Sequence, residues 1–228
     1  MSWPGPSRTP TPSCTSRADV SATRRAIAGA CFALAGLFFV LYPAIRPFSS
    51  ETGLQGAAAF ASTAWVVAHS LAIVAFILLV LGLLGVYLAL QQTAVEALML
   101  VAVVASWIGV GLTLPFYGAE VFGLHAIGQA ALKKNDAGLV ALAGDVRGEP
   151  GIWFIVVGLL LLAVGIVVFA VAAWRSRVLT RWIGVPLAAG FALYLPQFTT
   201  AQPVRVAHGL LIAAGCWLVA WNLLAARR

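Results

Sequence analysis

Long, nearly uninterrupted runs of hydrophobic residues recur along the chain. Their apolar positions are continuous and do not alternate with polar ones. This excludes the strands of a membrane barrel and favours helices, because a helix satisfies its own backbone hydrogen bonds inside lipid. Most runs approach or exceed the roughly 20 residues that cross a bilayer as a helix. Six transmembrane spans are predicted, at about residues 26–42, 64–90, 95–116, 151–174, 182–195 and 206–224.

Helix-breaking residues set the expected connections between these spans. Pro115 is expected to end or kink the third span, because proline lacks the backbone N–H that an α-helix needs. Residues 117–150 then form the only long connection, and residues 46–63 form a loop or a short re-entrant element. The fifth span, at residues 182–195, is short and contains Pro186.

The chain is expected to form one folded domain. Residues 24–228 make up a single transmembrane helical domain, because no polar segment is long enough to build a core of its own. Residues 1–23 are rich in Pro, Ser and Thr and are expected to form a disordered cytoplasmic tail. Within the spans, small residues such as Gly109 and Gly111 are expected to let helices approach closely.

Composition and charge agree with this pattern and narrow the setting. The chain is 62% hydrophobic and 9% charged, whereas a soluble domain carries about 25% charged residues. The net charge of +7 does not indicate nucleic-acid binding, because the basic residues cluster at the ends of apolar runs, where anionic lipid head groups account for them. With the N-terminus inside, nine of the 14 basic residues fall on the cytoplasmic side. Both termini are therefore expected in the cytoplasm, and the protein is expected to be a multi-pass protein of the cell membrane, with the lipid bilayer as its partner.

This threading brings the polar residues of the apolar segments to the outer side of the membrane. All three histidines, His69, His125 and His208, are among them. Glu120 lies in the stretch Leu114–Gln129, where it stands among aromatic residues and glycines. Each residue could serve structure alone, by reaching to head groups or by holding helices together through a hydrogen bond. Their convergence indicates a functional chamber, because ionisable residues inside a membrane usually pair and usually have a role.

Glu120 is the main candidate for chemistry. A carboxyl group in an aromatic, low-dielectric site could stay protonated and act as a general acid, whereas a nearby arginine would hold it ionised; the sequence leaves both open. The candidate catalytic residues are Glu120, His69 and His125. The candidate substrate-binding residues are Arg46, Trp65, Phe116, Tyr117, Tyr194, Gln197, Arg205 and His208.

Sequence motifs for common cofactor chemistry are absent. The chain contains no HExxH motif, no Walker loop, no dinucleotide-binding glycine fingerprint and no GxSxG elbow. It also lacks the aspartate-rich motifs that bind magnesium diphosphate. The histidines and Glu120 match no tight metal-ligand spacing. Neither a metal nor a cofactor is therefore expected.

Four passages of the chain resemble a widespread group of small multi-pass membrane proteins from bacteria with high-GC genomes. They are ATRRAIAGACFALAGLFFVLYPAIRP, STAWVVAHSLA, LPFYGAEVFGLHAIGQ and LYLPQF…VRVAHGLLIAAG. The resemblance covers nearly the whole chain after residue 23 and brings no established activity. In size and style the chain is also similar to small integral-membrane terpene cyclases, which hold a protonating carboxylate among aromatic residues in a compact helical bundle. None of their motifs matches residue by residue, so this second likeness is an analogy.

Three functions are compatible with these observations. The first is a membrane enzyme, a cofactor-independent cyclase or isomerase, that acts on an apolar isoprenoid or lipid-like substrate. Its chemistry starts with protonation, with Glu120 as the acid, in a polar pocket near the outer leaflet. The second is a small-molecule transporter or accessory subunit that binds an anionic or amphiphilic ligand through Arg46 and Arg205. The third is a non-catalytic assembly protein whose polar cluster only ties helices together.

Overall fold

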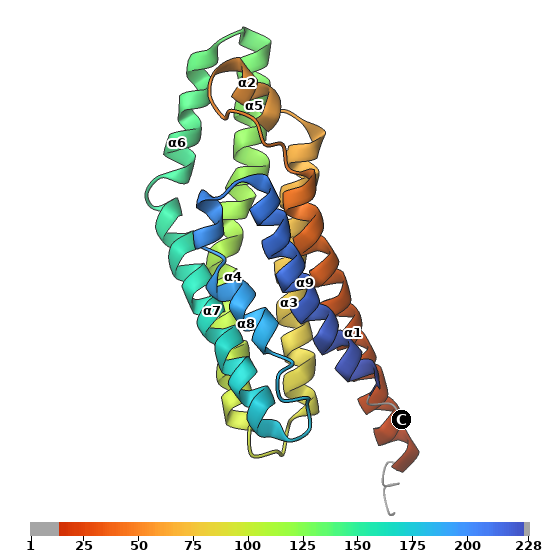
Figure 1. Ribbon diagram of the computed structural model, residues 1–228. Helices are drawn as coiled ribbons and strands as arrows, with labels where there is room; N and C mark the ends of the chain where they lie inside the picture. The colour runs from red at the N-terminus through yellow and green to blue at the C-terminus, as the bar shows by residue number, and fades with distance from the viewer. Residues whose placement is uncertain (1–13, 226–228) are drawn as a thin grey trace, which may run out of the picture.

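Five long helices form an elongated bundle in the computed structural model, which describes residues 14–225 (Figure 1). The helices run side by side along the long axis of the molecule, and each contributes a segment long and apolar enough to cross a bilayer. They are α1 (Cys14–Ile45), α3 (Thr63–Ala89), α4 (Glu96–Gly118), α7 (Gly151–Ser176) and α9 (Gln202–Ala225). The described residues include no strand. The prediction of an all-α, multi-pass membrane bundle is confirmed.

Shorter helices gather beyond one end of the bundle. They are α2 (Gly53–Phe60), α5 (Leu124–Lys134), α6 (Leu142–Arg147) and the 3₁₀ helix η2 (Ala137–Ala141). We call these four elements the cap, and the end that carries them the capped end (Figure 1). Within the cap, α2 and α5 cross so closely that a Cβ added to Gly128 would lie 2.7 Å from a backbone carbonyl oxygen of α2.

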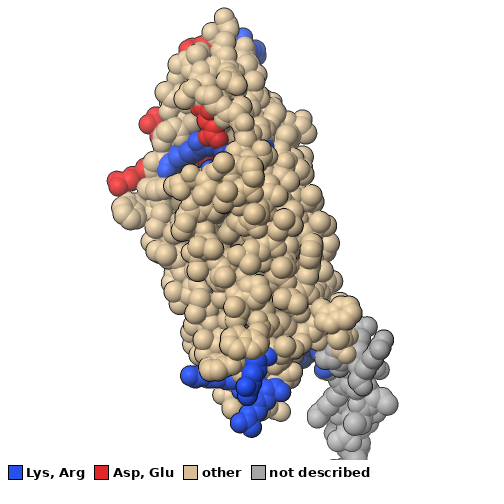
Figure 2. All heavy atoms as spheres, in the orientation of Figure 1, with Lys and Arg blue, Asp and Glu red and all other residues tan. Residues whose placement is uncertain are grey.

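The surface of the bundle suits a lipid environment. Figure 2 shows charged side chains at the two ends of the visible face and an uncharged belt between them; the lower end of this face shows basic side chains only. Large apolar side chains in the middle of α4 and α7 face outward. Val101, Ile108, Leu160 and Val164 are each more than half exposed. Exposure of these side chains is not unfavourable in a bilayer, because lipid tails are as apolar as the side chains themselves.

The third span does not end at Pro115, so of the two expected outcomes, an end or a kink, the first is wrong. α4 continues through Pro115 to Gly118, and the π-helical turn η1 (Ala119–Gly123) then joins it directly to α5, which ends at Lys134. The result is a helical segment of 39 residues that leaves the bundle and enters the cap. Proline removes only one hydrogen-bond donor, and the wider π turn after it accommodates the disturbed backbone.

The predicted fifth span, at residues 182–195, is wrong in length. The chain there forms only the eight-residue helix α8 (Val185–Ala192), and the 3₁₀ helix η3 (Pro196–Thr199) follows it toward the capped end (Figure 1). α8 is not among the helices long enough to cross a membrane. Pro186 suits the first turn of a helix, whereas Pro196 cannot continue one. α8 packs against both α7 and α9.

The first helix begins earlier than the sequence predicts. α1 starts at Cys14, so residues 14–23 are helical and the prediction of a disordered tail is wrong for them. No proline follows Pro12 until Pro43, so the helix of the apolar run can extend toward the N-terminus. The rest of the expected tail, residues 1–13, lies outside the described residues. Both ends of the described chain lie opposite the cap (Figure 1), and their location in the cytoplasm stays a prediction.

α4 and α7 are in close backbone contact through glycines. A Cβ on Gly109 would lie 2.5 Å from the backbone nitrogen of Leu162, and a Cβ on Gly158 would lie 2.7 Å from the carbonyl oxygen of Gly109. Close packing of this kind holds helices together in lipid, where burial of apolar surface gives no advantage. A Cβ on Gly111 would meet nothing within 4 Å. The expectation of close packing is therefore right for Gly109 and wrong for Gly111.

The pair Gly109 and Gly111 provides a matched test of this packing. We expect Gly109→Ala to destabilise the protein by about 1–3 kcal/mol, because the added methyl group would clash with the backbone of α7 and push this helix away from α4. Gly111→Ala should be neutral or stabilising by up to about 1 kcal/mol, since alanine favours a helix more than glycine does. Thermal unfolding of the purified protein in neutral detergent measures both. Equal melting temperatures for the two variants would contradict the expectation.

Candidate functional site

A cavity of about 500 Å³ lies beside the capped end. This volume is within the range of about 300–1,000 Å³ that small-molecule sites occupy. Its lining comes from segments far apart in the sequence, because the ends of several helices and the connections between them meet there. The polar and charged part of the lining includes Arg46, Glu51, His69, Glu120, Arg147 and Arg205. The apolar part includes Phe48, Phe116, Ile152, Ile155, Val156, Leu195 and Phe198.

The π turn places Glu120 in the wall of this cavity. The N–H of Leu124 bonds to the carbonyl oxygen of Ala119, five residues back, and not to that of Glu120 as it would in an α-helix. The carbonyl oxygen of Glu120 accepts a hydrogen bond of 2.7 Å from the indole Nε1 of Trp65. Trp65 is completely buried on α3. This bond therefore fixes the π turn to α3 and holds Glu120 in position.

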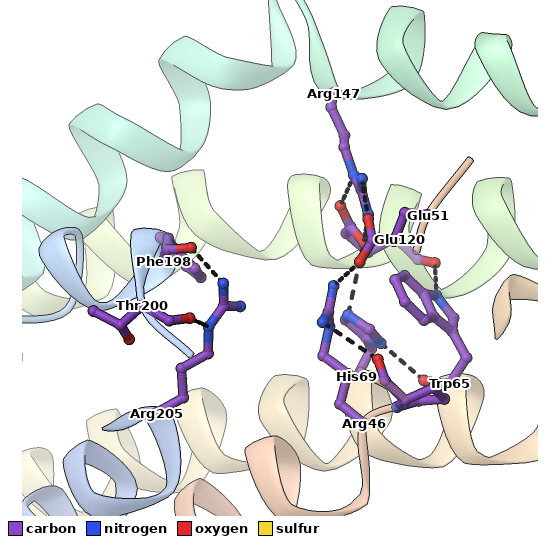
Figure 3. Close-up of polar contacts among 10 residues, drawn as sticks. Arg46, Glu51, Trp65, His69, Glu120, Arg147, Phe198, Thr200 and Arg205 are labelled. Carbon is purple, nitrogen blue, oxygen red and sulfur yellow. Dashed lines mark hydrogen bonds and ion pairs between the residues drawn. The ribbon is translucent and has the colours of Figure 1, made fainter. Parts of the chain in front are cut away.

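Two arginines and two glutamates form a continuous ion-pair network (Figure 3). Arg147 donates from Nε to Oε1 of Glu120 at 2.6 Å and from Nη2 to Oε2 at 3.0 Å, the forked geometry in which guanidinium and carboxylate match. The Nη1 of Arg147 donates to Oε2 of Glu51 at 2.6 Å. The other oxygen of Glu51 accepts from Nη2 of Arg46. The two positive and two negative charges cancel within the network.

The pKa shifts of Glu51 and Arg147 favour the charged form of each group. Burial by itself raises the pKa of the Glu51 carboxyl, but the guanidinium groups of Arg147 and Arg46 outweigh this and lower it below its ordinary value of 4.5. Burial lowers the pKa of the Arg147 guanidinium, yet the hydrogen bonds and charges of Glu120 and Glu51 raise it above its ordinary value. Glu120 accepts two hydrogen bonds from the guanidinium of Arg147. The sequence leaves open whether Glu120 lies among aromatic rings alone or beside an arginine. In the structure it lies beside an arginine, Arg147.

Aromatic rings surround the arginines of the network. The guanidinium carbon of Arg46 lies 4.8 Å from the ring centre of Trp65 and 5.1 Å from that of Phe48. That of Arg147 lies 5.5 Å from the ring centre of Phe60. Cation–π contacts contribute about 0.5–2 kcal/mol each, more where water is excluded. They offset part of the cost of moving charged groups out of water.

His69 faces Glu120 from α3. Its Nδ1 lies 2.8 Å from the carbonyl oxygen of Trp65, and because a carbonyl oxygen only accepts, Nδ1 carries the hydrogen. In a neutral ring Nε2 is then an acceptor, and it lies 3.6 Å from Oε2 of Glu120. His69 is buried. Two acceptors that face each other in a buried site can bind a shared proton or a donor group of a ligand.

A group of tyrosines joins the cavity to a much smaller crevice. The hydroxyl groups of Tyr117 and Tyr194 are 3.2 Å apart. The ring centre of Tyr42 lies 5.3 Å from that of His69 and 5.8 Å from that of Tyr117. Tyr42 lines both the cavity and the crevice, whose volume is about 10 Å³. The crevice is also lined by Tyr194, Gln197 and His208.

Most of the sequence-predicted site residues are brought together, and some are not. The cavity is lined by Glu120, His69, Arg46, Phe116, Tyr117 and Arg205. The adjacent crevice holds Tyr194, Gln197 and His208. Trp65 lies behind the cavity wall, where it supports the network. His125 lies in the cap, because it is the second residue of α5: its Nδ1 lies 3.0 Å from the carbonyl oxygen of Phe60, and its Nε2 lies 3.0 Å from the amide of Gln129.

Eleven residues that line the cavity are absent from the sequence-based candidates. Those with charged or aromatic side chains are Tyr42, Phe48, Glu51, Arg147 and Phe198. A local signal exists for Glu51, because it follows Arg46 by five residues in a chain with only seven acidic residues. Arg147 and Glu51 are 96 positions apart. A pair so distant leaves no trace in the pattern of a single sequence.

The lowered pKa of Glu51 predicts how stability responds to acid. Its ion pairs stabilise the protein fully above the unfolded pKa of about 4.5, and this contribution is lost as pH falls through the lower folded pKa. We expect Glu51→Gln to unfold at a lower temperature than the wild type at neutral pH. The difference should shrink toward the acid end of the range. Melting temperatures across the acid range measure this, with Asp145→Asn, an exposed residue of α6, as the control. A difference that stays constant with pH would contradict the assignment.

Comparison of the chain with protein-family models, with curated proteins and with solved structures gave no match. The two resemblances inferred from sequence passages therefore stay predictions. The site itself combines an apolar wall, a charge-balanced network, a histidine facing a carboxylate, and Arg205 on the same cavity.

Proposed function

We propose that this protein binds a lipid-like molecule, apolar or amphiphilic, in the cavity beside the capped end. The observation that carries the proposal is the division of one cavity of about 500 Å³ into an apolar and a charged side. A space of this size can hold a small amphiphile, whose apolar chain would pack against the apolar side of the lining.

The apolar side offers a surface for such a chain. Ile152, Ile155 and Val156 come from the first turns of α7, and Leu195 and Phe198 come from the connection between α8 and α9. None of these side chains carries a polar atom that would need a partner. The charged side, with the ion-pair network and Arg205, suits a polar end of the same molecule. The cavity is therefore matched to an amphiphile better than to a sugar, a nucleotide or a metal ion.

The short α8 supports access from the bilayer. A full span in this place would cover α7 and α9 along their length, whereas α8 has only eight residues. Toward the capped end, η3 and its neighbours take the place of a helix (Figure 1). A molecule dissolved in lipid would have to displace only this short connection to enter.

Two neighbouring valines of α7 test the proposal. Val156 lines the cavity, whereas Val157 is 43% exposed and faces outward. We expect purified wild-type protein to be labelled on cavity residues by a hexadecanol that carries a photoreactive diazirine in its chain. Val156→Trp should reduce that labelling about tenfold or more by filling the space, and Val157→Trp should leave it unchanged. Mass spectrometry of the labelled peptides measures both. Labelling spread evenly over the lipid-facing surface of the wild type would refute the proposal.

A second candidate function is acid–base chemistry on the bound molecule, such as isomerisation or cyclisation of an isoprenoid chain. The observation that favours it is the Nε2 of His69, an acceptor in the neutral ring, 3.6 Å from Oε2 of Glu120. Both carboxyl oxygens of Glu120 accept hydrogen bonds from Arg147, so the acceptor that stays open to a proton is Nε2 of His69. His69 and Glu120 together could take up a proton and return it to a substrate.

Deuterium exchange tests the second candidate. If the pair moves protons to and from carbon, incubation with a polyprenyl alcohol in heavy water should incorporate deuterium into the chain. We expect Glu120→Gln and His69→Gln to slow incorporation at least about 100-fold. His125→Gln, a change in the cap, should have no effect. Wild-type protein that incorporates no deuterium into polyprenyl alcohols, while the diazirine probe still labels the cavity, would leave binding as the function.

A further inference from the structure

We propose that the head group of the bound molecule carries a single negative charge and that Arg205 binds it. This inference rests on the binding function proposed above and names the class of ligand. It is carried by the charge balance of the cavity and by the way Arg205 is held.

The charges that line the cavity do not cancel. Arg46 and Arg147 are matched by Glu51 and Glu120 within the ion-pair network. Arg205 lines the same cavity, and no carboxylate within ion-pair distance faces it among the described residues. Its charge therefore remains. An unbalanced charge at a membrane-embedded site is costly and usually marks a functional position.

Arg205 is held in place by groups that leave its charge uncompensated. Its Nε donates to the carbonyl oxygen of Thr200 at 2.9 Å, and its Nη2 donates to that of Phe198. Its guanidinium carbon lies 5.1 Å from the ring centre of Phe48. Figure 3 shows this guanidinium beside Phe198 and Thr200 and apart from the two carboxylates. An arginine that served only as an interfacial anchor would extend to water and would not need two backbone carbonyls to direct it along a cavity wall.

The surroundings of Arg205 add to the attraction for an anion. It lies in the first turn of α9, where the partial positive charge of the helix N-terminus acts on the same side. Arg46, which also lines both the cavity and the crevice, is close by. The charge of Arg46 is balanced within the ion-pair network, so the cavity as a whole carries one surplus positive charge, that of Arg205. A carboxylate or a phosphodiester, each with one negative charge, neutralises it; a dianion would leave a surplus of the opposite sign.

The apolar wall indicates the kind of chain that the head group carries. A molecule that placed its anion at Arg205 would find Phe198 and Leu195 next to it and the first turns of α7 on the cavity wall. The ligand class is therefore an amphiphile with one monoanionic oxygen head group and an apolar chain. A free long-chain carboxylate and an anionic phosphodiester lipid share this chemistry.

Charge-matched probes test this assignment in the full-length protein in neutral detergent at mildly alkaline pH. Hexadecanoic acid and hexadecanol, each with a mid-chain diazirine, compare a monoanion with a neutral molecule of the same length. We expect the wild type to bind the acid roughly 10- to 100-fold more tightly than the alcohol, the range that a hydrogen-bonded charge supplies. Arg205→Gln should remove this preference, and Arg205→Lys should retain part of it, because lysine keeps the charge and loses the fork. Arg181→Gln, a change at an exposed arginine between α7 and α8, should have no effect.

A second set of variants keeps the test independent of Arg205 itself, which also supports the backbone around η3. Glu51→Gln adds one positive charge to the cavity without touching Arg205, and it should tighten binding of the acid but not of the alcohol. Glu96→Gln adds the same charge at the start of α4 and should change neither. Competition by unlabelled hexadecanoate against phosphatidylglycerol distinguishes a free carboxylate from a phosphodiester lipid.

The outcomes separate the two proposals. Equal affinity of the wild type for acid and alcohol, or a preference for the acid that survives Arg205→Gln, would overturn the assignment of Arg205 and leave the binding function standing. Failure of both probes to label the cavity in the wild type would overturn the binding function itself.

Discussion

Burial of charge inside an apolar bundle is the constraint on which the rest of this structure depends. A lone carboxylate or guanidinium in such surroundings is strongly unfavourable, so each has to meet a partner with good geometry. The ion-pair network meets this requirement with one residue after α1, one before α2, one in the π turn and one at the end of α6. The network also ties the cap to the bundle, because the carboxylates and guanidinium groups pair with one another only when these four segments come together.

The π turn and Trp65 show how backbone and side chain cooperate at this point. A regular α-helix would use the carbonyl oxygen of Glu120 for its own hydrogen bond. The π turn leaves this oxygen to the indole of Trp65, which in turn lies against Arg46. The carbonyl of Trp65 meanwhile fixes the tautomer of His69. One tryptophan thereby positions the carboxylate, the imidazole and one guanidinium around the cavity.

Part of the cavity wall comes from the connection that follows a crossing shorter than a full span. α8 fills the space between α7 and α9 only in part, and the connection after it carries Phe198 and Thr200, the residues that direct Arg205. The same connection thus lines the cavity and orients the one cavity arginine without a carboxylate partner among the described residues. An apolar wall on one side and a surplus positive charge on the other result from this arrangement, and together they support the proposal of an amphiphilic anion as the ligand.

The sequence by itself determined the class of fold, because continuous apolar runs can satisfy their backbone groups in lipid only as helices. It also placed Glu120, His69, Arg46 and Arg205 at one end of the bundle, since the threading of spans fixes which ends share a side. It misjudged the length of the span at residues 182–195, and it left open whether Pro115 ends or kinks a helix that in the structure continues to Gly118. Only the tertiary structure decided the partners. Glu120 pairs with Arg147, and Glu51 bridges two arginines, one of them 96 positions away. Ion pairing depends on distance in space, and a single sequence specifies distance only for residues close together along the chain.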